Sequence, residues 1–170
     1  MSRGMSSHFR NPQPQPNRGA APVGHLAELP DVERGAVLFL RHWCEGDAAR
    51  AAIARDFALV FGSEQGAELA QAQDQLMRLV LGQARRPLMR HSDGCTCIGG
   101  DESAFAQMIA AAASGDEELA TLFALTLIAA PAVAPVLKLA EQLGLAYADI
   151  FSPLAHSLGR HFTRFAPRQH

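Results

Sequence analysis

Residues 91–102 of the chain read HSDGCTCIGGDE, and this segment separates two long stretches that both have helical patterns. It contains Cys95 and Cys97, which are two of the three cysteines, together with His91 and three glycines. Glycine adopts backbone conformations that other residues avoid, so the segment can turn sharply. We therefore expect a compact loop between helices, and this loop holds the residues best suited to chemistry.

The composition predicts an all-α fold. The chain has 170 residues, of which 48% are hydrophobic, 19% charged and only 6% aromatic, and alanine and leucine are abundant. These two residues lose little conformational freedom in a helix. The length suits one core of ordinary size. We predict a single compact domain of six or seven helices over residues 27–170, preceded by a disordered, Pro/Gln-rich tail over residues 1–26.

Apolar spacing and capping residues place the individual helices. The predicted helices span residues 30–46, 47–61, 63–86, 101–114, 116–128, 135–143 and a last segment that begins at residues 152–153. The helix over residues 116–128 is apolar on nearly all sides, so we expect it to be the central, most buried one. Gly144 is expected to end the helix before it.

One uncharged run needs a comparison with a membrane span. Residues 119–137 carry no charge and approach the length of a spanning helix. Pro131 and Pro135 interrupt this run, and each proline removes a helical hydrogen bond. We therefore expect two helices and no transmembrane segment. The N-terminus lacks an apolar leader and the cysteines do not form a secreted disulfide pattern, which predicts a cytoplasmic protein with reduced thiols.

The central loop has ligands that suit a metal ion. Zinc favours four thiolate or imidazole ligands in a tetrahedron. Cys95 and Cys97 can face one ion across a bent backbone, and His91 is near enough to be a third ligand. Cys44 is expected on the inner face of the first helix and is the candidate fourth ligand. His42 is off that face and is expected to point to water.

The same two cysteines also suit redox chemistry. A disulfide between Cys95 and Cys97 closes a very small ring, so it would be strained and easily reduced. Cys97 precedes a predicted helix, whose dipole is expected to lower its thiol pKa. Cys44 is a candidate resolving thiol. An inert connecting loop is the third interpretation of this segment.

Nucleophilic catalysis is the least supported interpretation of the loop. His91 and Cys95 would form the nucleophile–base pair, with Asp93 or Asp101 orienting the imidazole. The pattern indicates neither a pocket nor an oxyanion site, so the chain is more typical of a protein without enzymatic activity. Asp101 and Glu102 are better explained as acidic residues at the start of a helix than as a general acid or base.

Partner binding is predicted mainly from the C-terminal segment. The formal net charge of −2 gives no general attraction to nucleic acid. Arg160, Arg164 and Arg168 nevertheless form a basic stripe that could contact nucleic acid. The favoured hypothesis is a non-catalytic, cytoplasmic helical protein that acts through a protein partner or self-association and whose loop binds structural zinc. The alternative is a small thiol redox sensor or thiol-dependent enzyme using Cys95 and Cys97.

Overall fold

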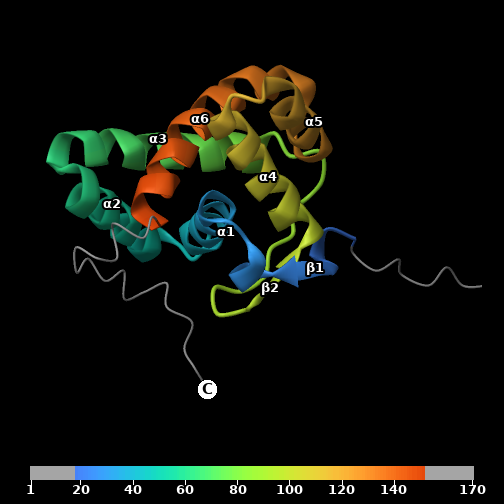
Figure 1. Ribbon diagram of the computed structural model, residues 1–170, viewed down its shortest axis with the longest axis horizontal. Helices are drawn as coiled ribbons and strands as arrows, with labels where there is room; N and C mark the ends of the chain where they lie inside the picture. The colour runs from blue at the N-terminus through green and yellow to red at the C-terminus, as the bar shows by residue number, and fades with distance from the viewer. Residues whose placement is uncertain (1–17, 152–170) are drawn as a thin grey trace, which may run out of the picture.

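A computed structural model describes residues 18–151, and its architecture confirms the all-α class (Figure 1). The helices in this range are α1 (Asp31–Trp43), α2 (Asp47–Phe61), α3 (Ser63–Gly82), α4 (Gly100–Ser114), α5 (Glu117–Leu127) and α6 (Val133–Phe151). The short elements are the strands β1 (Pro22–His25) and β2 (Cys97–Gly99) and the 3-10 turns η1 (Arg18–Ala20), η2 (Leu26–Glu28) and η3 (Ala130–Ala132). Among the helices over residues 18–151, none combines the length and the apolar character needed to cross a membrane.

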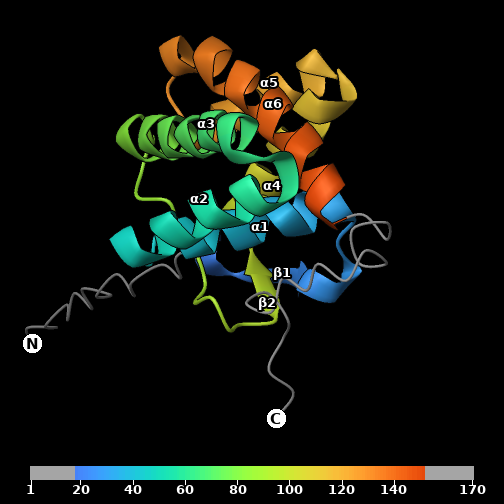
Figure 2. The ribbon, with the colours of Figure 1, turned by 90° about the vertical axis from the view of Figure 1, so that its left-hand side faces the viewer.

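The core forms around α1 and α4, which lie next to each other with α6 packed against both (Figures 1 and 2). The α1 side chain Phe39 is fully buried and stacks on Phe57 of α2 and on Tyr147 of α6. Offset aromatic stacking adds to the free energy gained from burying these large apolar rings. The Tyr147 hydroxyl donates a hydrogen bond to Gln73 of α3, so the same cluster joins four helices.

The α2–α3 contact depends on two glycines. Gly62 joins the helices with a φ of 85°, a left-handed conformation that favours glycine. A Cβ at Gly66 would lie 2.5 Å from Cα of Ala58, so only glycine permits this approach of the two backbones.

The expected helix over residues 63–86 ends earlier than predicted, at Gly82, and residue 84 pairs as an isolated bridge with residue 128.

The last described helix is longer than the sequence predicts. The α6 helix continues through Gly144 to Phe151, although a glycine there was expected to end it. A Cβ at Gly144 would lie 2.7 Å from the Cβ of Ala113 in α4. Gly144 is therefore a close-packing residue within the helix, which explains why the local sequence signal misplaced the helix end.

The prediction that the helix over residues 116–128 is central is wrong. This helix, α5, lies at the edge of the domain and buries only a narrow stripe formed by Ala120, Ala124 and Leu127. Leu119 and Leu122 face outward, with 39% and 58% of their surface exposed. The centre is occupied by α1 and α4 because they bury side chains against neighbours on several sides.

Part of the expected disordered tail is structured. Residues 18–25 form η1 and β1, and β1 pairs antiparallel with β2, with His25 opposite Cys97. Gly19 packs against Asp101, where a Cβ would lie 2.3 Å from Oδ2. Backbone pairing and one glycine contact hold this segment in place, and neither requires apolar side chains. The sequence therefore has no apolar pattern that would predict its structure. Residues 1–17, and the predicted last helix after residue 151, lie outside the described residues.

Candidate functional site

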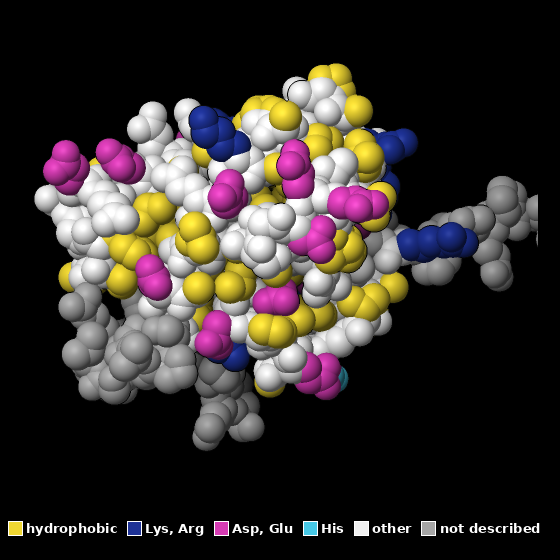
Figure 3. Space-filling view, turned by 45° about the horizontal axis from the view of Figure 1, so that its top comes forward, with side chains coloured by type: hydrophobic (Ala, Val, Ile, Leu, Met, Phe, Trp, Pro, Cys, Tyr) yellow, Lys and Arg dark blue, Asp and Glu magenta, His cyan; other side chains and the backbone are white. Residues whose placement is uncertain are grey.

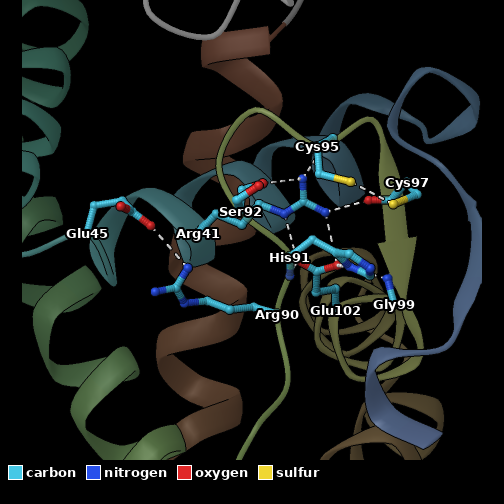
Figure 4. A network of polar contacts seen from close by, with 9 residues as sticks. All are labelled: Arg41, Glu45, Arg90, His91, Ser92, Cys95, Cys97, Gly99 and Glu102. Carbon is cyan, nitrogen blue, oxygen red and sulfur yellow. Dashed lines mark hydrogen bonds and ion pairs between the residues drawn. The ribbon is translucent and has the colours of Figure 1, made fainter. Parts of the chain in front are cut away.

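A buried arginine organises the central loop. Arg41, in the last turn of α1, has no exposed surface. Its Nη1 donates to the carbonyl oxygens of Cys95 (2.6 Å) and Ser92 (3.3 Å), and its Nη2 donates to that of Cys97 (2.7 Å) (Figure 4). Its Nε bonds Glu102 Oε1 at 2.6 Å. One guanidinium therefore fixes the backbone on both sides of the Cys-x-Cys sequence.

Glu102 completes this arrangement from the first turn of α4. Its carboxylate accepts hydrogen bonds from the backbone N–H groups of His91 (2.9 Å) and Gly99 (2.8 Å), and His91 Nδ1 lies 2.8 Å from Oε2. Burial alone would raise the pKa of Glu102, but the hydrogen bonds from Arg41, Gly99 and His91 outweigh it and lower that pKa. An ionised carboxylate only accepts, so His91 Nδ1 carries the proton in this contact.

A second acidic residue holds the start of the loop. Asp101 is 3% exposed and accepts two hydrogen bonds from the Arg86 guanidinium, at 2.7 and 2.6 Å, and one from Met89 N at 2.8 Å. Two neighbouring carboxylates at the start of α4 thus hold the loop from Arg86 to Gly99. Their position at a helix N-terminus is favourable for negative charge.

The two loop thiols are in direct contact. Cys95 Sγ and Cys97 Sγ lie 2.6 Å apart, compared with about 2.05 Å in a disulfide. Both are free cysteines and both are partly exposed. The contact with Cys95 is the main cause that raises the pKa of Cys97, and burial adds to it. The pKa of Cys97 was expected to be lowered at the start of α4, and this expectation is wrong because the net shift is upward.

The four predicted zinc ligands do not converge. Cys95 and Cys97 lie together, whereas the polar contacts of His91 are with Glu102. Cys44 lies partly buried at the end of α1, where its carbonyl accepts a 3.5 Å hydrogen bond from Arg90, and burial raises its thiol pKa. Within residues 18–151, no group of three or more His, Cys, Asp and Glu side chains is placed to hold a metal ion. Among residues 18–151, no third protein ligand for zinc lies with Cys95 and Cys97, and zinc binding stays a prediction.

His42 differs from its predicted position. Its side chain was expected in water, but it is only 12% exposed and its Nδ1 lies 3.0 Å from Asp93 Oδ2. The loop folds back over the end of α1 and covers this residue. The helical spacing correctly predicts that His42 points away from the inner face of α1. It cannot predict that the loop packs over that side of the helix and covers His42. Asp93 thereby contacts His42 rather than His91.

The sequence interpretation missed the role of Arg41. A signal was present, because Arg41 follows Val37 by four residues and precedes Cys44 by three, which places a charge on the apolar side of α1. A charge on a buried face requires a partner of opposite charge. Glu102 was interpreted as an ordinary helix-start acid, and nothing local links it to Arg41.

Comparison with known proteins adds no family assignment. No family model matches the chain, and comparisons with curated proteins and with solved structures gave no match. The function must therefore be inferred from the loop itself.

Proposed function

We propose that the chain is a non-catalytic thiol redox sensor in which Cys95 and Cys97 interconvert between a dithiol and a disulfide. The observation that carries this proposal is the 2.6 Å contact between the two sulphurs on a partly exposed loop. Little movement brings them to bonding distance. A reducing cytoplasmic location belongs to the proposal, because such a compartment returns the strained disulfide to the dithiol.

The oxidation has two balanced steps. In the first, the Cys95 thiolate attacks a hydroperoxide, so an S–O bond forms, the O–O bond breaks and an alcohol or water leaves after taking up a proton. In the second, the Cys97 sulphur displaces hydroxide from the Cys95 sulfenic acid, so the disulfide forms and water leaves. The 2.6 Å contact between the sulphurs places Cys97 beside the Cys95 sulfenic acid, so the second step needs little movement. A cellular dithiol reverses the reaction by exchange.

The hydrogen bonds of Arg41 link the redox state of Cys95 and Cys97 to the conformation of the loop. The carbonyls of both cysteines accept hydrogen bonds from the same guanidinium. Closing a small disulfide ring changes the backbone between these carbonyls, so it changes how well they fit Arg41. The loop positions Ser92, Asp93 and Thr96 are exposed and would present the altered surface to a partner.

Thiol trapping across glutathione redox buffers tests the proposal. We expect mass spectrometry to find a reversible 95–97 disulfide in the wild type and in Cys44→Ser. Cys97→Ser should stop at a mixed disulfide of Cys95 with glutathione in these buffers, and at a Cys95 sulfenic acid when a hydroperoxide is the oxidant. Hydrogen exchange at His91 N and Gly99 N, both bonded to Glu102, should be faster in the oxidised form. Two unlinked thiols throughout the redox range would contradict the proposal.

Metal analysis separates this proposal from the zinc hypothesis. Protein purified under reducing conditions is expected to contain no stoichiometric zinc and to show three reactive thiols after unfolding. One zinc per chain that protects Cys95 and Cys97 from alkylation would favour the zinc hypothesis instead. Cys44→Ser and His91→Ala would then identify the remaining ligands.

A further inference from the structure

The uncharged run over residues 119–137 forms an exposed apolar surface that the thiol loop does not explain. Its exposed members include Leu119, Leu122 and Thr126 on α5 and Ala130 and Pro131 at η3. In Figure 3, which brings α5 and α6 toward the viewer, apolar side chains lie exposed between charged ones. Exposed apolar side chains that are surrounded by charged ones occur at protein interfaces.

The most exposed apolar residue of α5 lies at its midpoint. The helix runs from Glu117 to Leu127, so Leu122 has five residues on each side. Leu122 is 58% exposed, and Leu119 and Thr126 lie on the same outer stripe at helical spacing. A helix whose most exposed apolar residue lies at its midpoint can pair with an antiparallel copy of itself around a two-fold axis.

Two opposite charges without an ion-pair partner among residues 18–151 lie at the two ends of α5, one within the helix and one on the segment that follows α3. Glu118 is exposed at the start and shares a face with Leu122 and Leu125. Arg85 lies at the other end, where its Nη1 donates to Leu125 O at 3.0 Å. Neither Glu118 nor Arg85 forms an ion pair with any residue from 18 to 151. An antiparallel copy would place each Glu118 beside the other copy's Arg85.

We propose that this α5–η3 surface binds a second copy of the chain, with α5 antiparallel to α5 and Leu122 at the two-fold axis. Apolar burial supplies the attraction, and the two Glu118–Arg85 pairs set the orientation. The contact is independent of Cys95 and Cys97, so its failure would leave the redox proposal untouched. Because the contact extends over only one short helix, we expect a weak, concentration-dependent dimer.

Sedimentation velocity under reducing conditions, over about a hundredfold range of concentration, tests the dimer. Leu122→Glu should raise the dimer dissociation constant about tenfold or more, because it places a charge at the centre of the contact. The matched control is Leu59→Glu on α2, where Leu59 is 73% exposed, and this variant should dimerise like the wild type.

A charge-exchange cycle tests the orientation. Glu118→Arg and Arg85→Glu should each weaken the dimer, and the double variant should recover much of the loss because the pair is restored with reversed sign. Circular dichroism confirms that each variant keeps its helices. A monomer at every concentration, a dimer insensitive to Leu122→Glu, or a double variant no better than the single ones would overturn the proposal.

Discussion

Arg41 and Glu102 form an ion pair in which neither side chain has any exposed surface, and Nε lies 2.6 Å from Oε1. The pair joins the end of α1 to the start of α4 across 61 sequence positions and holds the thiol loop between them. Buried charges are costly unless they are paired and hydrogen-bonded, and here both conditions are met.

Glu102→Gln should strongly destabilise the domain. The amide has nearly the same shape but leaves the buried Arg41 guanidinium without a compensating charge. Breaking a buried pair from one side costs about 3–5 kcal/mol. Urea unfolding followed by circular dichroism measures the free energy of unfolding. Glu141→Gln, at an exposed site on α6, is the control and should change it by less than about 0.5 kcal/mol.

Acid should remove the stabilisation that Glu102 provides. Its folded-state pKa lies below the unfolded value of about 4.3, so the unfolded state binds more protons in the acid range. This contribution is complete above the unfolded pKa and is lost as the pH falls through the folded pKa. The difference in unfolding free energy between wild type and Glu102→Gln should therefore shrink below about pH 4. A difference that stays constant down to acid pH would show that the charge of Glu102 does not matter.

Removing Cys95 should make Cys97 easier to ionise. The contact with Cys95 is the largest cause that raises the pKa of Cys97. In Cys95→Ala this contact is absent, so the pH midpoint for alkylation of Cys97 should fall. Iodoacetamide labelling at a series of pH values, quantified by peptide mass spectrometry, measures the midpoint. Cys44→Ala is the control and should leave it unchanged; an equal shift in both variants would count against the sulphur contact.

Two glycines of the same helix should respond in opposite ways to alanine. At Gly66 a Cβ would lie 2.5 Å from the Ala58 backbone, so Gly66→Ala should cost at least about 1–3 kcal/mol. At Gly82 nothing lies within 4 Å of such an atom, so Gly82→Ala should be neutral or stabilise by up to about 1 kcal/mol. Thermal and urea unfolding of both variants measure this. Equal effects would mean that the α2–α3 approach is looser than described.

Local sequence signals determined much of the fold. Apolar spacing located α1, α2 and α4, and glycine and acidic residues marked several of their ends, because these signals act within one or two helical turns. The Cys-x-Cys loop was recognisable for the same reason, since two cysteines one residue apart must lie near each other. The sequence therefore predicted where this loop and its two cysteines lie, although not the residues that hold the loop.

Long-range packing decided the rest. Periodicity shows that a helix has an apolar face but not which neighbour covers it, so α5 was expected at the centre and instead lies at the edge with Leu122 exposed. Gly144 had the local signature of a helix end, and only contact with α4 explains why α6 continues. The partner of Arg41 likewise depends on the tertiary structure, because the energy of a buried charge is set by groups that the fold brings from 61 positions away.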